Sequence, residues 1–441
     1  MSFTRTLRAV GGAVVAGALL FGTAPVASAD KIRDDQWPLE AFDADAVWKE
    51  STGKGVKVAV LDNGVDGTHP DLEGNVLPGK KLLGGRADQE SVDDHGTGMA
   101  SIIAGHGHGA SGADGVKGLA PDAKILPVDM MKEDGGEELV RGALAEALTY
   151  AVDAGATVIN VSFNTFALSA DDKAAISYAL KKDVVLVAGA GNENSNRLGT
   201  PADAPGFVSV GAVGKDLEDW EDSNSNPKLT LTAPGEYIRS AAATTPYQLT
   251  SGTSDSTAYV SGAAAVLRAK FPDLTAGQII NRLVKTAVLP DSKKHLKLPD
   301  ADYGYGIIRP YSALTKDIPA GPRNGPLEMP KDVAAGSNGA DGTDASGSNQ
   351  AEEEKGLATA AIVGIAAGVL VLIALLIVVI VRKNRRNGPP PGVPGGFGPS
   401  APGFPPQQPG GYPQQPGAYP QQAGPPGAYP SAPPTQPPGQ Y

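Results

Sequence analysis

Five short apolar runs, separated by longer segments, dominate the first half of the chain. They cover residues 56–61, 125–128, 157–161, 184–187 and 207–213. Runs of this length are typical of strands that are buried on both faces of a parallel sheet. Between successive runs, residues 138–154 and 174–181 have the pattern of crossover helices. Strands that alternate with helices predict an α/β fold with a doubly wound, mostly parallel sheet.

Polar side chains lie just beyond two of the predicted strands, at the edge where parallel sheets place their sites. Asp62 directly follows the first run, and Asn192 follows Gly189-Ala190-Gly191 beyond the fourth. A carboxylate at a strand end is held firmly, and a glycine-rich turn lets an amide approach a bound molecule closely. We therefore expect Asp62 and Asn192 to lie at one edge of the sheet.

A histidine and a serine begin two further predicted helices. His95 precedes Gly96-Thr97-Gly98 and an apolar stretch, and Ser254 opens another apolar helix. A serine hydroxyl becomes a nucleophile when a histidine takes its proton and a carboxylate orients that imidazole. Asp62, His95 and Ser254 therefore predict a serine hydrolase. An amide at Asn192 would stabilise the developing oxyanion.

The segments around these residues resemble the motifs of the subtilases, a family of serine endopeptidases. The order aspartate, histidine, serine is that of subtilisin. The resemblance covers about residues 37–316, and its motifs are Asp62-Asn63-Gly64-Val65, His95-Gly96-Thr97, Gly189-Ala190-Gly191-Asn192-Glu193 and Gly252-Thr253-Ser254. It implies a subtilisin-like fold, peptide-bond hydrolysis without a cofactor, and substrate pairing along Ser162, Phe163 and Asn164.

Within the subtilases the chain is most similar to the mycosins, membrane-anchored proteases associated with type VII secretion. The similarity rests on Gln36-Trp37-Pro38-Leu39, on Ala258-Tyr259 where secreted subtilisins usually have Pro-His, and on an apolar C-terminal segment. It implies a protein or peptide substrate and an association with a type VII secretion membrane complex.

Two departures from the family pattern bear on activity. Asn164 replaces a glycine that usually lines the specificity pocket, so the resemblance implies a narrower pocket that favours small residues. Asp255 directly follows the predicted nucleophile. It either points inward and opposes the oxyanion, or points to solvent and favours the helix dipole. The alternative to an active protease is a weak or inactive homologue with a structural role in a membrane secretion complex.

The N-terminal residues predict export across the membrane. Residues 1–29 have the pattern of a signal peptide, with Arg5 and Arg8, an apolar stretch, and Ala27-Ser28-Ala29 before the expected cleavage site. Residues 30–316 then form the predicted peptidase domain with its N-terminal extension.

An apolar segment near the C-terminus predicts a single membrane span. Residues 357–381 contain no charged side chain over 25 positions. As a helix they measure roughly 37 Å, which exceeds a bilayer core of about 30 Å. Basic residues follow directly at 382, 383, 385 and 386, and positive charge beside a span marks the cytoplasmic side. The catalytic domain is therefore expected outside the cell membrane and the C-terminal tail inside.

Two segments have compositions that predict no packed core. Residues 317–356 are rich in Pro, Gly, Asp, Ser and Asn and are expected to be a disordered linker. Residues 382–441 combine the basic cluster with a tail rich in Pro, Gly, Gln and Tyr, which holds 19 of the chain's 38 prolines. This tail either docks in polyproline conformation on aromatic grooves or is simply solvated.

Charge and cysteine content exclude several other classes of protein. The net charge of -11 argues against a polyanion as partner, so we expect no nucleic acid. The absence of cysteine excludes disulfides and thiolate-bound metals. His106 and His108 lie in a glycine-rich stretch that predicts a solvated loop. We identify no set of loop carboxylates with convincing calcium spacing, and no metal is expected.

Overall fold

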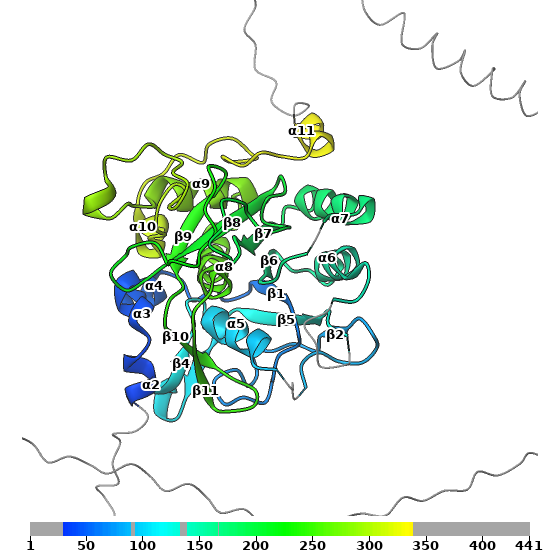
Figure 1. The fold of residues 1–441 in the computed structure, drawn as a ribbon. Helices are drawn as coiled ribbons and strands as arrows, with labels where there is room; N and C mark the ends of the chain where they lie inside the picture. The colour runs from blue at the N-terminus through cyan, green and yellow to red at the C-terminus, as the bar shows by residue number, and fades with distance from the viewer. Residues whose placement is uncertain (1–29, 90–92, 133–138, 166, 338–441) are drawn as a thin grey trace, which may run out of the picture. The chain divides into compact units, whose positions relative to one another are not determined.

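A seven-stranded parallel sheet forms the centre of the computed structural model, which describes residues 30–89, 93–132, 139–165 and 167–337 (Figure 1). Its strands run in the order β2-β5-β1-β6-β7-β8-β9. They are β2 (Lys80–Lys81), β5 (Lys124–Asp129), β1 (Lys57–Asp62), β6 (Val158–Val161), β7 (Val185–Gly189), β8 (Phe207–Val213) and β9 (Leu231–Pro234). The predicted parallel α/β sheet is confirmed, and each of the five apolar runs is one of its strands.

Helices cover both faces of the sheet because alternate side chains of each strand point to opposite sides. On one face, Val58 and Val60 belong to a core with α5 (His95–Ala104), α8 (Thr253–Lys270), α9 (Ala276–Thr286) and α10 (Pro310–Thr315). On the other, Ala59 and Leu61 belong to a core with α6 (Ala143–Asp153) and α7 (Ala170–Lys181). Figure 1 shows this separation of the helices. The sheet is therefore doubly wound.

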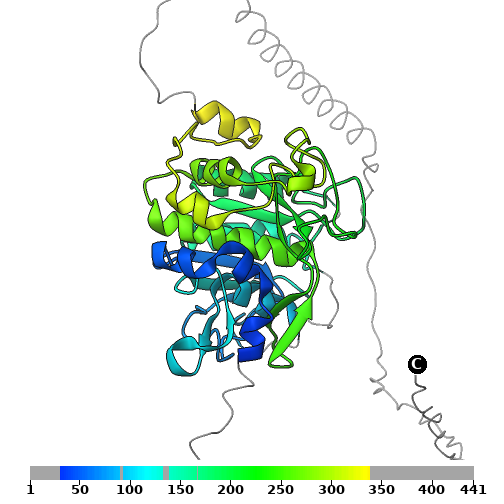
Figure 2. The same cartoon turned by 90° about the vertical axis from the view of Figure 1, so that its left-hand side faces the viewer.

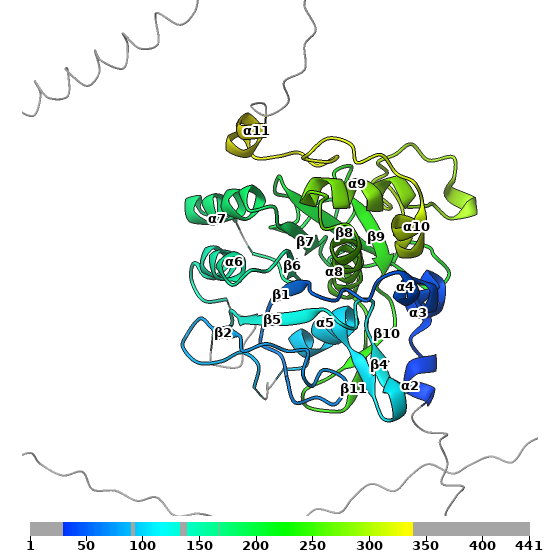
Figure 3. The same ribbon diagram turned by 180° about the vertical axis from the view of Figure 1, so that it is seen from behind.

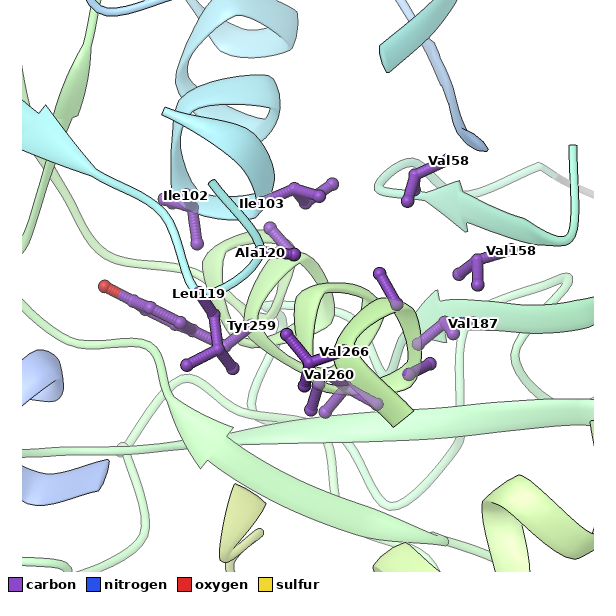
Figure 4. Close-up of a cluster of buried hydrophobic side chains, with 14 of the residues drawn as sticks. Val58, Ile102, Ile103, Leu119, Ala120, Val158, Val187, Tyr259, Val260 and Val266 are labelled. Atoms are coloured by element: carbon purple, nitrogen blue, oxygen red, sulfur yellow. The ribbon is translucent and has the colours of Figure 1, made fainter. Parts of the chain in front are cut away.

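Helix α8 carries the predicted nucleophile and is buried along most of its length. Figure 4 shows Tyr259, Val260 and Val266 of this helix among Ile102 and Ile103 of α5 and strand residues of the sheet. Truncation of one such buried aliphatic side chain to alanine typically costs about 2–5 kcal/mol. The start of α8 is thus fixed by the core itself.

The N-terminal extension packs as three short helices, α2 (Asp30–Asp34), α3 (Trp37–Phe42) and α4 (Ala44–Glu50). Trp37 Nε1 donates a hydrogen bond to Glu236 O at 3.1 Å. The Phe42 ring meets Tyr259 of α8 edge to face, with centroids 5.4 Å apart. Figure 3 shows α3 and α4 beside α10. Two of the mycosin-like segments are therefore connected: helix α3, which contains Trp37-Pro38-Leu39, contacts Tyr259 of the segment Ala258-Tyr259.

Two antiparallel hairpins lie outside the main sheet. One pairs β3 (His106–His108) with β4 (Asp114–Lys117) around the 3-10 turn η2 (Ala110–Gly112), and the other pairs β10 (Ile238–Ala241) with β11 (Tyr247–Thr250). The predicted solvated loop is therefore a hairpin, and its histidines have partners. His106 Nε2 lies 2.9 Å from Glu73 O, and His108 Nδ1 lies 2.6 Å from Asp71 Oδ1.

The first part of the predicted linker is ordered against the domain. Beyond α10, backbone carbonyls accept hydrogen bonds from α9: Gln278 Nε2 donates to Gly321 O at 3.1 Å, and Arg282 Nη1 donates to Ile318 O at 3.3 Å. The segment then reaches α11 (Lys331–Ser337), drawn in yellow in Figure 2. Asp332 Oδ1 of this helix accepts a hydrogen bond from Ser177 Oγ of α7 at 3.0 Å. The expectation of disorder from residue 317 is thus wrong for 317–337.

Several predicted segments lie outside the described residues. They are the signal peptide 1–29, the rest of the linker 338–356, the span 357–381 and the tail 382–441. Within the described part of the chain, no helix is both long and apolar enough to cross a membrane.

Candidate active site

The end of β1 and the start of α5 bring Asp62 and His95 together. His95 Nδ1 lies 2.8 Å from Asp62 Oδ1 and 3.0 Å from Asp62 Oδ2. The carboxylate is almost fully buried, whereas 38% of the imidazole is exposed. A hydrogen bond of this kind fixes the tautomer and orientation of a histidine and leaves its Nε2 available to a reacting group.

The glycine after His95 permits this close approach. A Cβ at position 96 would lie 2.1 Å from Gly64 O and 3.2 Å from Asp62 Cβ, so only glycine fits. Gly96 N also donates to Asn63 Oδ1 at 2.9 Å. The first turn of α5 is further fixed by Asp94, whose Oδ1 accepts from Ala243 N at 2.8 Å. These contacts explain why a glycine directly after His95 is required for the imidazole to approach Asp62.

Burial and charge act on His95 in opposite directions. Burial disfavours the charged imidazolium, but the charge and hydrogen bond of Asp62 more than offset this and raise the pKa of His95 above its ordinary value. Asp255 and Asp93 add further negative charge that raises this pKa. Since the neutral imidazole is the proton acceptor, activity through His95 should fall as the pH drops through this raised pKa.

Ser254 is the second residue of α8 and lies in the same pocket as Asp62 and His95. Its Oγ donates a hydrogen bond to Ser162 O at 3.2 Å. In this geometry the hydroxyl points to the segment that is predicted to bind substrate. The Ser254 proton is therefore engaged with Ser162 O and must be redirected before it can pass to His95.

Buried polar residues hold the start of α8 to the sheet. Ser162 Oγ donates to Ser254 O at 3.4 Å and accepts from Asn160 Nδ2 at 2.9 Å. Asn160 Oδ1 in turn accepts from Ser261 Oγ, further along α8, at 3.0 Å. This network places the serine backbone at a defined point above the end of β6.

The amide of Asn192 is oriented by the residue before the serine. Asn192 Oδ1 accepts from Thr253 N at 2.9 Å and from Thr253 Oγ1 at 2.8 Å. Because the oxygen is engaged, Nδ2 is the end of the amide that remains to donate. Asn192 lines the same pocket as Ser254. The arrangement fits an oxyanion donor that needs no reorientation during the reaction.

One pocket of about 570 Å³ contains every residue of the predicted site. Asp62, His95, Asn192, Ser254 and the segment 162–164 all line it. The Asn164 side chain lies over Gly199, where a Cβ would come within 2.2 Å of Asn164 Oδ1. The side chain that replaces the expected glycine therefore forms part of the pocket lining.

Sequence reasoning missed several residues of this pocket and its support. Thr253, Asn160 and Ser261 orient the predicted groups. Thr253 belongs to the serine motif and Asn160 to the segment Asn160-Val161-Ser162-Phe163, whereas Ser261 belongs to neither. Asp129, at the end of β5, pairs in register with Asp62 and faces Lys81 at 3.6 Å. Its position just past an apolar run was the available signal.

The chemistry that the pocket offers comes from hydroxyl, imidazole, carboxylate and amide groups. Together these groups can abstract a proton, form an ester with an acyl group, and stabilise a negative oxygen. In the described part of the chain, no group of three or more His, Asp or Glu side chains could hold a metal ion.

Such groups at the end of a parallel α/β sheet are the arrangement typical of the subtilisin-like serine peptidases. A profile of the Subtilase family matches residues 53–306. The chain belongs to the subtilase family, the subtilisin-like serine peptidases. A thermophilic serine proteinase of Bacillus sp. (strain AK1) is 33% identical over 272 residues, which are 62% of this chain and 65% of that protein. The chain thus spans less than two thirds of that relative's length.

Solved structures support the narrower resemblance. MycP1 from Mycobacterium smegmatis superimposes with a TM-score of 0.57 and 30% identity, over 67% of this chain and 88% of that chain. The MycP3 protease from a type VII (ESX-3) secretion system superimposes with a TM-score of 0.54 and 31% identity, over 64% and 88% respectively. The predicted likeness to subtilases, and among them to mycosins, is confirmed.

Proposed function

We propose that this protein is a membrane-anchored extracytoplasmic serine endopeptidase that hydrolyses peptide bonds. Asp62, His95 and Ser254 act as its triad, and Asn192 acts as an oxyanion donor. The observation that carries this proposal is the convergence of four residues from distant parts of the sequence on one pocket, with Asp62 already bonded to His95.

The geometry supports acyl transfer to water. His95 Nε2 takes the Ser254 Oγ proton as the oxygen attacks the peptide carbonyl, and Asp62 stabilises the imidazolium. Asn192 Nδ2 and the Ser254 backbone N–H bind the oxyanion at the positive end of α8. His95 then gives the proton to the leaving amine. A water molecule, activated by His95, hydrolyses the acyl-enzyme.

Substrate binding is proposed to occur by strand addition along Ser162, Phe163 and Asn164. These residues follow β6 directly and line the pocket. With the Asn164 side chain in the pocket lining, small substrate residues before the scissile bond should be preferred over large aromatic ones.

The proposed location rests on the sequence pattern of the terminal segments and on the similarity to MycP1 and MycP3. In this proposal, residues 1–29 direct export and residues 357–381 anchor the protein, with the tail in the cytoplasm. A type VII secretion membrane complex is the proposed setting. Carbonate extraction of membranes and protease protection of the tail in intact cells test the anchoring and its orientation.

A second candidate function is structural, in which a weak or inactive peptidase domain serves a membrane secretion complex. Two observations favour it. The Ser254 hydroxyl donates to Ser162 O, and a buried carboxylate, Asp255, follows the serine directly. This structural function requires a folded domain in which Ser254 is not reactive.

A fluorophosphonate probe on the full-length chain separates the two functions. We expect the probe to label the wild-type protein and Ser251→Ala, a nearby serine whose Oγ accepts from Tyr237 N at 2.9 Å. We expect no labelling of Ser254→Ala. Absence of labelling in wild-type protein with a cooperative thermal transition would favour the structural role.

A further inference from the structure

Asp255 is a buried carboxylate that the proposed hydrolysis does not use. Its side chain is on the inward side of α8, and only 2% of the residue is exposed. Of the two orientations left open by the sequence, the structure therefore has the inward one. Thr250 Oγ1 donates to Asp255 Oδ1 at 2.8 Å. This hydrogen bond anchors one carboxylate oxygen to the end of β11.

The other carboxylate oxygen lies near the proposed oxyanion donor. A Cβ built on Gly252 would lie 3.6 Å from Asp255 Oδ2 and 3.4 Å from Asn192 Nδ2. The carboxylate and the proposed oxyanion donor thus lie against the same glycine. A negative charge at Asp255 is therefore close to the position where the reaction develops charge.

Few ionisable groups face Asp255 in the described part of the chain. Gln248 Nε2 of β11 donates to Asp94 O at 3.2 Å, directly before His95, so the strand that holds Asp255 through Thr250 also contacts the start of α5. His95 favours the charged form of Asp255, and Tyr259 lies one turn further along α8. The neighbours from the other packed elements, Thr250 and Asn192, are uncharged. Burial dominates and raises the pKa of Asp255 to about 7, against the hydrogen bond from Thr250 and the charge of His95.

We propose that Asp255 is a positioning residue of this hydrolysis: a second buried carboxylate that, together with Asp62, holds His95 in its charged form and restricts the reaction to higher pH. This inference rests on the proposed function. It differs from a structural role for Asp255 because it predicts a change in the titration of another residue.

The coupling gives the effect a characteristic pH range. Where Asp255 is ionised, its charge raises the pKa of His95 and lowers the fraction of neutral imidazole. Below the pH at which Asp255 takes up its proton, this influence disappears. Replacement of Asp255 should therefore increase activity between about pH 7 and the midpoint of His95, and change little below about pH 6.

The test replaces Asp255 by asparagine in the full-length chain and follows His95 by NMR of ¹⁵N-labelled histidine. We expect the midpoint of the His95 titration to fall by about one pH unit in Asp255→Asn. The rate of fluorophosphonate labelling should rise up to about tenfold within the range given above, because one pKa unit corresponds to a tenfold change in neutral imidazole.

Asp93→Asn is the matched control. Asp93 also raises the pKa of His95, but its side chain is exposed. Its effect should therefore decrease in about 1 M salt, whereas the effect of buried Asp255 should persist. An Asp255→Asn effect that vanished in salt would contradict the proposal.

Further outcomes decide the remaining cases. A folded Asp255→Asn protein with an unchanged His95 titration overturns the proposal. If Asp255→Asn does not fold, the Thr250 variants test the proposal instead. Thr250→Val removes the hydrogen bond to Asp255 and must lower the midpoint of the His95 titration, whereas Thr250→Ser keeps the donor and must not. Equal His95 titrations in the two Thr250 variants overturn the proposal. A shifted titration without labelling at any pH supports the coupling and overturns the proposed hydrolysis instead.

Discussion

Two aspartate–histidine pairs of nearly equal geometry occupy different regions of this protein. His95 Nδ1 lies 2.8 Å from Asp62 Oδ1, and His108 Nδ1 lies 2.6 Å from Asp71 Oδ1. Both carboxylates are buried, and the imidazoles are 38% and 39% exposed. By distance and burial alone, neither pair would be singled out as catalytic.

Their surroundings differ in chemistry. The first pair shares a pocket with a serine hydroxyl and an amide donor. Around the second, Asp71 Oδ2 accepts from Val116 N at 2.8 Å, and Arg33 Nε of α2 donates to Gly115 O at 2.9 Å. Burial and the carboxylate of Asp71 raise the pKa of the Tyr247 hydroxyl. The second pair therefore joins the N-terminal extension to both hairpins.

An aspartate orients a histidine in both places, and the neighbouring groups decide what the oriented ring does. At His95 those neighbours can use a proton acceptor. Near His108 the neighbouring groups are backbone amides and carbonyls, the guanidinium of Arg33 and the phenol of Tyr247. There the aspartate–histidine pair has a structural role. Substitutions at the two aspartates should therefore separate activity from stability.

The largest contrast is expected between Asp62→Asn and Asp71→Asn. Asparagine at 62 favours the wrong tautomer of His95, so kcat should fall by about 10⁴-fold, on the scale known for triads. Asp71→Asn should leave kcat/KM within about threefold of wild type, because a structural link outside the pocket affects transition-state stabilisation little. Peptide hydrolysis at pH 8 measures both. Equal losses in the two variants would remove the distinction between the pairs.

Asn192→Ala should give the next largest effect, a fall in kcat of about 10²–10³-fold, which is the loss known for the oxyanion amide of subtilisin, a member of the same family. Since Asn192 is exposed, water can replace the hydrogen bonds that its side-chain oxygen accepts from Thr253, so the thermal midpoint should change little. Steady-state kinetics with a thermal melt test this, and a loss confined to KM would argue against oxyanion binding.

Asp71→Asn should instead lower the free energy of unfolding by roughly 1–3 kcal/mol, because a buried carboxylate that accepts several hydrogen bonds is replaced. Urea unfolding followed by tryptophan fluorescence measures it. His108→Gln, which removes one partner at the exposed side, is the control and should have a smaller effect. A free energy of unfolding of Asp71→Asn equal to that of the wild type would show that the Asp71–His108 pair has no structural role.

The smallest expected effect is on specificity. Asn164→Gly removes a side chain from the pocket lining, so large aromatic residues before the scissile bond should gain about tenfold in relative kcat/KM. Cleavage of a peptide library by both proteins measures the ratio. An unchanged profile would show that Asn164 does not limit the pocket.

The strands could be predicted from the sequence where they are buried on both faces of the sheet, because such strands are continuous apolar runs. Runs such as 207–213 are strands because both faces of the sheet are covered. The edge strand β2 has only two residues, Lys80 and Lys81, and β9 has the mixed sequence Leu-Thr-Ala-Pro, so neither produces a recognisable apolar run. The hairpin at His106 was missed because glycine-rich turns resemble loops until a distant carboxylate, Asp71, is brought beside them.

The sequence allowed us to predict which residues form the candidate site, but not most of the contacts between them. Asp62, His95, Asn192 and Ser254 lie next to strand and helix ends, and the sequence shows those ends. The direction of a single side chain depends on packing. For that reason neither the hydrogen bond from Ser254 to Ser162 O nor the inward orientation of Asp255 could be derived from the sequence.

The ordered segment beyond α10 determines where a soluble catalytic fragment should stop. Arg282 donates to the carbonyls of Ala313, Lys316 and Ile318, and Asn281 Nδ2 donates to Pro319 O and Ala320 O at 3.2 Å each. A fragment ending at residue 316 would strip acceptors from both side chains and uncover α9. Expression boundaries near residue 337 would keep this outer layer in place.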